Sequence, residues 1–314
     1  ILAFAYPDRV AKIISGNRYQ LSQGTNAVLP ENTPLSGAEF LTVADVDNSG
    51  ALVRIFLAAR LSKEHLLKQF AGQLTEEDIT QWQNGRITCR NILKFGEIVL
   101  NERQHEADDS DAIRVIIELI RNKGLSVLPW DKDGLGLRSR NRWYRNFRNS
   151  DDWPDLSDET LLQTLENWLA PFLPGIRNIE GINTLNLKDI LMSIFTYEQM
   201  QELDKMAPSH LRLPSGTRAL IDYDETDKPV LAVKLQELFG QTDTPRIAAG
   251  AVPVLIHLLS PAMRPLSVTQ DLKSFWLNTY PEIVKQMRMK YPRHVWPDDP
   301  LNAVPTNRTK PRNR

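Results

Sequence analysis

The hydrophobic periodicity of the chain changes at residues 104–111, a polar segment with the sequence QHEADDSD. Before this segment, apolar residues alternate with other residues over 53–60, which is the two-residue period of a half-buried strand. After it, isoleucines recur over 113–120 at the spacing of one helical face. The change predicts an α+β protein with a domain boundary at this segment.

The region 16–105 has the pattern of a small β-barrel. One helix, at about 62–73 with Ser62 as its N-cap, interrupts a series of short strands separated by glycine and asparagine turns. The candidate strands are 18–22, 25–29, 39–46, 53–60, 86–92 and 95–101. Five or six short strands with one inserted helix predict an OB-like barrel, and a plain antiparallel sandwich is the alternative.

The region 106–297 is predicted to be a mixed helix and antiparallel-sheet domain. Its helices are expected to begin at Ser110, at Ser157, at about residue 187 and at Thr269. Strands are expected at 218–223, 229–235 and 252–259, the first two forming a hairpin. Residues 298–314 lack apolar periodicity and are expected to form a flexible basic tail.

Composition excludes several classes of protein. The chain carries 38 basic and 39 acidic residues, so a uniformly basic nucleic-acid coat is excluded, although a local basic surface is not. Charge is segregated: 151–206 holds eleven acids and three bases, whereas 264–314 holds ten bases and four acids. The single Cys89 excludes a disulfide framework and a multi-cysteine metal site, which suits the cytoplasm. No membrane span or signal peptide is recognisable.

Catalytic signatures are absent from the sequence. None of the fifteen glycines precedes a lysine, so a phosphate loop is excluded, and the five histidines lack metal-ligand spacing. The string DETD at 224–227 matches a helicase Mg²⁺ motif, but it lies in the predicted hairpin turn and is interpreted as a solvated turn. Cys89 is expected to be a structural thiol. We therefore predict no catalytic residue, metal or cofactor in this chain.

Two clusters of basic residues precede residue 150. Alternation places the first on one face of a barrel strand, where a single strand of nucleic acid could bind: Arg86, Thr88, Arg90 and Lys94. The second combines a row of arginines, which bind phosphate, with an aromatic residue that could stack on a base: Arg138, Arg140, Arg142, Trp143 and Arg145. The alternative is that the strand face is simply solvated and that nearby Asp151 and Asp152 neutralise the row.

A third cluster lies near the C-terminus. A helix end and the proline-bounded loop after it carry five of its members, and Arg264 is expected to converge on that loop: Arg264, Lys285, Arg288, Arg293, His294 and Trp296. A loop rich in Arg, His and Trp is unusual for a purely solvated surface, and both a functional and a structural interpretation stay open. An independent phosphodiesterase-like activity built on Arg264, Arg293 and His294 is a further hypothesis, but no metal ligand or nucleophile accompanies these residues.

Several segments carry a family resemblance. The strings LAFAYPDRVA (2–11), PDLSDETLLQTLENWLAPFLPGI (154–176), HLLSPAMRPLSVTQDLKSFW (257–276) and YPRHVWPDDP (291–300) resemble the C-terminal half of bacterial HrpB-type ATP-dependent helicases of the DEAH-box group. The resemblance implies that 1–15 ends a helical-bundle domain, that 16–105 is an OB-like domain and that 106–297 is specific to this family. A chain that opens at Ile1 is then expected to be part of a longer protein.

The resemblance also implies a division of labour. The family's residues for ATP and Mg²⁺ lie in upstream RecA-like lobes, so none is carried over to this chain, and ATP hydrolysis is not expected here. The implied partners are single-stranded nucleic acid, RNA more than DNA, and the upstream lobes and helical domains. The alternative is a protein-interaction module that docks the motor or another partner through the acidic helices of 154–206 and the apolar residues of 2–14.

Overall fold

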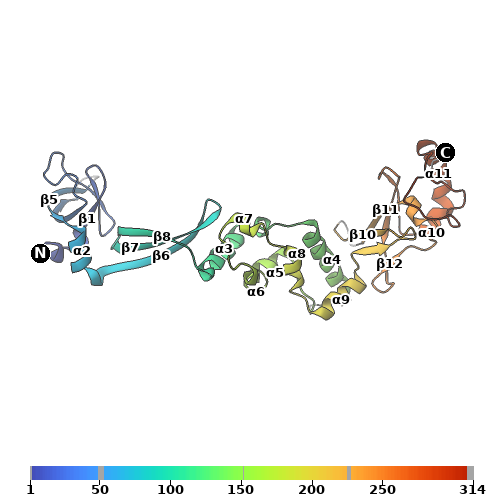
Figure 1. Ribbon diagram of the computed structural model, residues 1–314, viewed down its shortest axis with the longest axis horizontal. Helices are drawn as coiled ribbons and strands as arrows, with labels where there is room; N and C mark the ends of the chain where they lie inside the picture. Colours follow the sequence, from blue (N-terminus) through green and yellow to red (C-terminus); the bar gives the residue numbers. More distant parts are fainter. Residues whose placement is uncertain (1, 49–52, 151, 225–227, 310–314) are drawn as a thin grey trace. The chain divides into compact units, whose positions relative to one another are not determined.

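The computed structural model of the chain describes residues 2–48, 53–150, 152–224 and 228–309. Contacts divide the chain into two units, one formed by 1–119 with 174–181 and the other by 120–173 with 182–314. Within the described ranges, no helix is long and apolar enough to cross a membrane. The predicted α+β class, a barrel followed by mixed helices and sheet, is confirmed (Figure 1).

The first unit begins with a closed barrel in the strand order β1-β2-β3-β5-β4. Its interior is filled by inward side chains such as Tyr19, Leu41 and Ile55, each at most 1% exposed. Two short helices, α1 and η1, precede five strands: α1 Leu2–Ala5, η1 Pro7–Arg9, β1 Val10–Ser15, β2 Arg18–Leu21, β3 Asn26–Val28, β4 Phe40–Asp47 and β5 Val53–Leu61. The small barrel predicted from strand alternation is therefore present.

The barrel starts earlier than the sequence indicates. Residues 10–14 lie before the first predicted strand, in the segment that the resemblance assigned to the end of a helical bundle, but they form β1, which pairs with β2 and β4 and closes the barrel. Val10 and Ala11 are fully buried there. Tertiary pairing decides the conformation, because a helical turn would leave this apolar run without partners.

The predicted strands 86–92 and 95–101 do not belong to the barrel. They form a separate antiparallel sheet in the order β6-β7-β8, with the strands β6 Leu74–Gln83, β7 Arg86–Phe95 and β8 Ile98–His105. β7 pairs along its whole length with β6, and the barrel is already closed through β1 and β4, so no barrel edge is left to receive β7. The assignment of Arg86, Thr88, Arg90 and Lys94 to a barrel strand is therefore wrong.

An apolar cluster joins this sheet to the barrel within the first unit. Helix α2 Lys63–Gln69, capped by the Ser62 side chain as predicted, contributes Leu66. Phe70 packs edge-on against Phe95 of β7, with ring centroids 5.3 Å apart. At the far end of the sheet, Cys89 is buried with Ala107 and Ala112 and lies 3.2 Å from the His105 ring nitrogen Nε2.

Helix α3 Asp109–Lys123 was predicted from its isoleucine spacing, although its cap differs. The Asp108 carboxylate, rather than Ser110, accepts the backbone N–H of Asp111. Gly124, with φ +82°, follows the helix. Because Ser110 already lies inside the helix, its hydroxyl cannot serve as the N-cap.

The helical part of the second unit is built from short helices. Ser157 caps α5 as predicted, whereas the single helix expected from about 187 to 206 is two helices, the second starting at the Thr196 capping box. The helices are η3 Leu125–Val127, α4 Lys132–Arg148, α5 Asp158–Gln163, α6 Leu165–Trp168, η4 Ala170–Phe172, α8 Leu187–Met192 and α9 Tyr197–Met206; α7 Ile179–Ile182 extends across the boundary between the units.

The second unit also contains a five-stranded sheet in the order β15-β14-β11-β10-β9 and a two-stranded sheet of β12 and β13. The strands are β9 His210–Arg212, β10 Arg218–Asp222, β11 Val230–Lys234, β12 Arg246–Ile247, β13 Val252–Pro253, β14 Leu255–Leu259 and β15 Pro265–Thr269. The predicted hairpin is the antiparallel pair β10 and β11, while β11 and β14 run parallel. Residues 225–227 of the DETD string lie outside the described residues.

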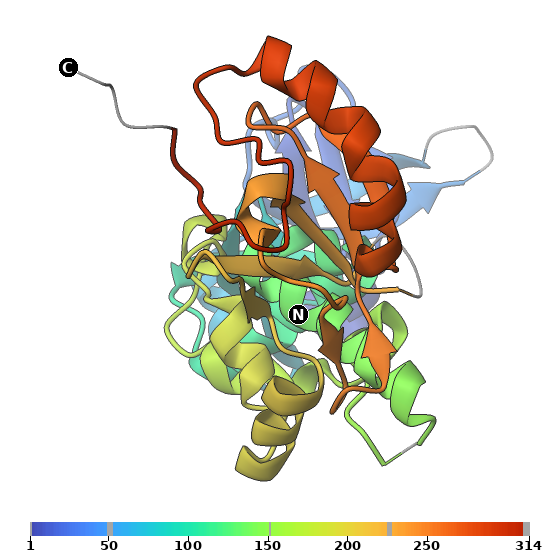
Figure 2. The same cartoon turned by 90° about the vertical axis from the view of Figure 1, so that its right-hand side faces the viewer.

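The last helices follow β15 and lie beside the sheet (Figure 2). Asp271, not Thr269, caps α10 Leu272–Ser274, because its carboxylate accepts the N–H of Ser274. The π-helix η6 Phe275–Thr279 and α11 Tyr280–Lys290 continue from it. Trp276 and Tyr280 pack edge-on against each other and contact Phe239, which forms the core of this end of the unit.

Gly96→Ala should destabilise the first unit far more than Gly16→Ala. Both glycines have a left-handed φ, +57° and +56°, which costs an alanine about 1–2 kcal/mol. At Gly96, however, an added Cβ would lie 2.2 Å from the Ser22 carbonyl oxygen, whereas at Gly16 it meets nothing within 4 Å. Urea unfolding should show a loss of stability at least about 2 kcal/mol larger for Gly96→Ala; equal losses would contradict this packing.

Candidate nucleic-acid interface

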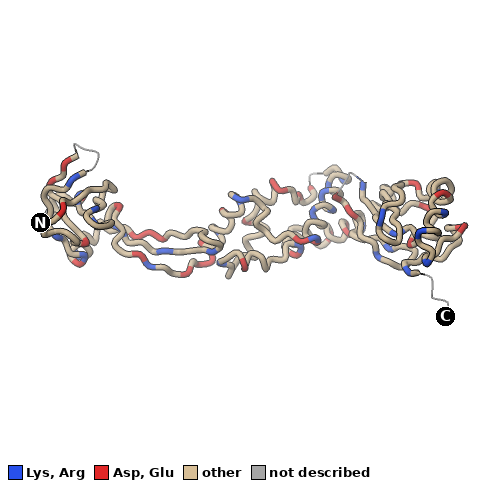
Figure 3. The backbone as a smooth tube through the Cα atoms, turned by 90° about the horizontal axis from the view of Figure 1, so that it is seen from above, with Lys and Arg blue, Asp and Glu red and all other residues tan. Residues whose placement is uncertain are grey.

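The first predicted cluster lies on β7, between two strands that carry acids. Lys94 forms an ion pair with Glu77 of β6 at 2.5 Å, and Arg90 forms one with Glu102 of β8 at 3.0 Å. Figure 3 shows the basic residues of this strand flanked by acidic ones. The Thr88 hydroxyl donates to the Gln81 carbonyl oxygen at 3.4 Å. Most of this cluster is therefore neutralised within its own sheet.

Arg86 differs from the rest of the β7 cluster. It lies at the turn end of the strand, is exposed, and forms no ion pair with any residue in the described ranges. Its backbone pairs with Asn178, and the neighbouring Ile87 N–H donates to the Arg177 carbonyl at 2.7 Å. The backbone is thus fixed while the guanidinium stays available to an external anion.

The arginine row of the second cluster lies on α4, and each of its members faces a carboxylate. Arg140 is buried, and its guanidinium donates to the Ala207 carbonyl and to Asp204. The other ion pairs are Arg138 with Asp158, Arg142 with Asp224 and Arg145 with Asp155, the last two at 3.6 and 3.2 Å. Acids that are distant in sequence therefore neutralise these four arginines. Of the two acids expected to do so, Asp152 pairs with Arg148 at the end of the same helix at 3.1 Å, and Asp151 lies outside the described residues.

Trp143 is not available to stack on a base. It is 8% exposed, and its ring lies parallel to that of Phe147 with centroids 5.5 Å apart. Tyr223 covers it from the sheet, with centroids 5.4 Å apart. Base stacking requires an open aromatic face, so Trp143 serves as a packing residue between α4 and the sheet.

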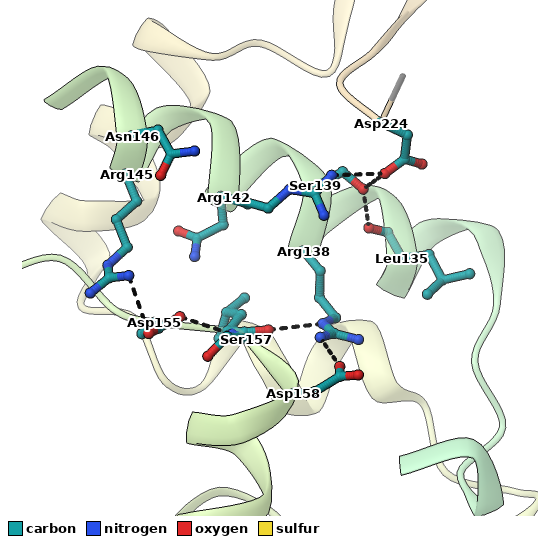
Figure 4. A pocket seen from close by; sticks show the side chains of 12 residues that line it. Leu135, Arg138, Ser139, Arg142, Arg145, Asn146, Asp155, Ser157, Asp158 and Asp224 are labelled. Atoms are coloured by element: carbon teal, nitrogen blue, oxygen red, sulfur yellow. Dashed lines mark hydrogen bonds and ion pairs between the residues drawn. The ribbon is translucent and has the colours of Figure 1, made fainter. Parts of the chain in front are cut away.

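Helix α4, the segment 155–158 and Asp224 line a cavity of about 480 Å³. Figure 4 shows Arg138 and Arg145 directed toward carboxylates on the opposite wall. Burial opposes ionisation of Asp155, but hydrogen bonds from Ser157 and Thr160 and the charge of Arg145 leave its pKa below the usual value. Three arginines face three aspartates here, so the cavity has little net charge to attract a phosphate.

Within the third cluster, two residues close the loop after α11 onto the helix. The Arg288 guanidinium donates to the Trp296 carbonyl at 2.7 and 2.9 Å and to Asp298 at 2.6 Å. The buried Trp296 indole N–H donates to the Tyr291 carbonyl at 3.0 Å. Lys285 is exposed and has no ion-pair partner among the described residues. Arg288 and Trp296 are structural.

The structure brings Arg264 close to the loop that carries His294. The Ser260 hydroxyl oxygen accepts the Arg264 backbone N–H at 3.1 Å and the Tyr291 hydroxyl at 3.5 Å. The rings of Tyr291 and His294 meet edge-on with centroids 6.1 Å apart. Arg293 is exposed on the same loop. The Arg264 backbone therefore lies next to the loop on which it was expected to converge.

Sequence analysis missed Lys234 as a member of this group. Burial lowers the pKa of His294, and the positive charge of Lys234 lowers it further. Lys234 is the last residue of the buried strand β11, but the parallel pairing of β11 with β14, which makes this strand end a place for ligands, is not visible in the sequence. No group of three or more His, Cys, Asp or Glu side chains able to hold a metal occurs within the described ranges.

Arg140→Ala should lower the free energy of unfolding by about 2 kcal/mol, because it leaves the Ala207 carbonyl without its donor and removes a buried side chain. Arg142→Ala is the matched control: its side chain is 63% exposed and its pair with Asp224 measures 3.6 Å, so we expect a loss below about 0.5 kcal/mol. Chemical denaturation followed by tryptophan fluorescence measures both values. Similar losses for the two variants would refute the structural role of Arg140.

The sequence is similar to a known protein family and to a characterised relative. Residues 168–300 match the family described as HrpB_C, ATP-dependent helicase C-terminal. The chain is 36% identical over 316 residues to the ATP-dependent RNA helicase HrpB of Escherichia coli (strain K12), covering 99% of this chain and 39% of that protein. The chain thus spans well under half the length of this relative.

Two solved structures agree with this match. The crystal structure of the E. coli DExH-box NTPase HrpB superimposes with a TM-score of 0.63 at 36% identity, over 98% of this chain and 39% of that one. The E. coli DEAH/RHA helicase HrpB gives a TM-score of 0.56 at 32% identity, over 94% and 37%. The predicted resemblance is confirmed: residues 168–300 match the C-terminal family model, and nearly the whole chain is similar to part of E. coli HrpB.

Proposed function

We propose that this chain is the non-catalytic part of an ATP-dependent helicase and that it binds single-stranded RNA. The observation that carries the proposal is a set of exposed cations that, in the described part of the chain, have no acidic partner: Arg86, Arg264, Lys285 and Arg293. The name of the E. coli relative, an RNA helicase, supports RNA as the nucleic acid.

Partner availability decides which cations we assign to RNA. An arginine already bound to a carboxylate must lose that contact before it can bind a phosphate, whereas an unpaired one need not. Arg138, Arg140 and Arg145 therefore hold the fold, and the unpaired cations supply the RNA contacts. Such phosphate contacts are largely independent of sequence and weaken as salt concentration rises.

ATP hydrolysis belongs, in this proposal, to upstream RecA-like domains of the whole protein, which also supply the residues for ATP and Mg²⁺. The chain's own contribution is to hold the RNA strand while those domains act on it. The single cysteine of this chain is buried as a free thiol, as is common in the reducing cytoplasm, and we place the protein there.

Docking of a protein domain is the second candidate function. It is favoured by apolar side chains that α1 and the residue after it leave on the surface: Phe4 is 59% exposed and Tyr6 40% exposed. Phe4 is held in place by stacking on Phe70, with ring centroids 5.0 Å apart. A rigid, exposed aromatic residue is typical of a protein contact.

Fluorescence anisotropy with a labelled single-stranded RNA tests the proposal on the 314-residue chain. Binding should weaken as salt rises, and Arg86→Ala with Lys285→Ala should weaken it about tenfold and reduce the salt slope by about two. The control combines two exposed arginines that already have acidic partners, Arg114→Ala with Arg142→Ala, and should retain the affinity. Absence of binding at low salt, or an equal loss in the control, would refute RNA binding by these cations.

A further inference from the structure

Three neighbouring strands of the five-stranded sheet place polar residues at one edge. Lys234 ends β11, Ser260 follows β14, and Arg264 precedes β15. β11 and β14 run parallel with Lys234 opposite Leu259, and β14 pairs antiparallel with β15 with Leu259 opposite Pro265. The pairing therefore sets Lys234 and Arg264 on either side of Ser260.

The loop after α11 covers the same edge. The Tyr291 hydroxyl donates to the Ser260 oxygen at 3.5 Å, and the His294 ring packs edge-on against Tyr291. Ser260 is only 1% exposed, and its oxygen already accepts two hydrogen bonds, which leaves its own proton to donate. His294 Nδ1 is buried and has no hydrogen-bond partner in the described part of the chain.

Positive charge at this edge is not balanced locally. Within the described residues, no carboxylate forms an ion pair with Lys234, Arg264 or Arg293. Asp298 is the acid of the covering loop that is closest in sequence to Arg293, and it forms an ion pair with Arg288. Glu237, the acid nearest Lys234 in sequence, is buried and accepts the Thr217 hydroxyl. An anion would supply the charge that this edge lacks.

We propose that Lys234, Ser260, Arg264 and His294 form a binding site for a phosphate group. The strand pairing and the Arg264 backbone hydrogen bond place these two residues next to Ser260, and a lysine point charge, an arginine fork and a hydroxyl donor together match an anion with several acceptor oxygens. Two parallel strands also end here, β11 and β14, and the carboxyl ends of parallel strands are a recurrent place for ligands. The inference deepens the proposed RNA binding and rests on it in so far as the phosphate belongs to RNA.

The His294 ring provides a direct probe of this site. Histidine ring signals of the ¹³C-labelled chain are recorded by NMR at constant pH and ionic strength, with the His294 signal assigned by His294→Gln. The titrants are inorganic phosphate and two RNA strands of one sequence, with a 5′-phosphate or a 5′-hydroxyl. We expect inorganic phosphate to move the His294 signal in a saturable way. Lys234→Gln with Arg264→Gln should abolish the shift.

The control is Lys273→Gln, which removes an exposed lysine beyond the opposite end of β15 and should leave the shift unchanged. A shift caused by both RNA strands would assign the site to a backbone phosphate, one caused only by the 5′-phosphorylated strand to a terminal phosphate, and one caused only by inorganic phosphate to a free anion. All three support the site. A His294 signal that no titrant moves, or that moves equally in the double variant, would overturn it.

Anisotropy on the same variants separates this inference from the proposed function. If the RNA site includes this edge, Lys234→Gln with Arg264→Gln should weaken RNA binding about tenfold. RNA that binds with full affinity to the double variant, while no titrant moves His294, would refute the site and leave RNA binding intact. A phosphate-dependent shift in a chain that binds no RNA would refute RNA binding and support the site.

Discussion

The buried guanidinium of Arg140 links α4 to the end of α9 by donating to the Ala207 carbonyl and the Asp204 carboxylate. The same kind of pairing recurs along α4 and across β7, where carboxylates from other segments meet most of the basic side chains. These ion pairs neutralise basic side chains that could otherwise bind a ligand. The same ion pairs that hold the fold therefore leave fewer cations free to bind an external anion.

This distribution explains why a basic run in sequence is a poor guide to a binding surface. The α4 row looks like a phosphate-binding face, yet its partners Asp155, Asp158 and Asp204 come from other elements. Lys234, by contrast, stands alone in sequence but shares a sheet edge with Ser260 and Arg264. Only the strand order brings that group together, so local composition could not reveal it.

Capping residues and hydrophobic spacing predicted the features that depend on interactions within a short segment. The Ser62 and Ser157 caps, the isoleucine face of α3 and the β10–β11 hairpin follow from hydrogen bonding and periodicity within short segments. The barrel was predicted as an architecture, but β1 and the separate sheet of β6, β7 and β8 were not. Alternation identifies a strand without identifying its neighbours, which depend on contacts between distant residues.

The central claim is that unpaired cations, not the paired arginines, contact RNA. Ultraviolet crosslinking of the 314-residue chain to single-stranded RNA, followed by mass spectrometry of the crosslinked peptides, tests it across the whole sequence. The account predicts crosslinks in peptides that contain Arg86, Arg264, Lys285 or Arg293 and few in α4. Crosslinks concentrated in α4, with none at the unpaired cations, would contradict it.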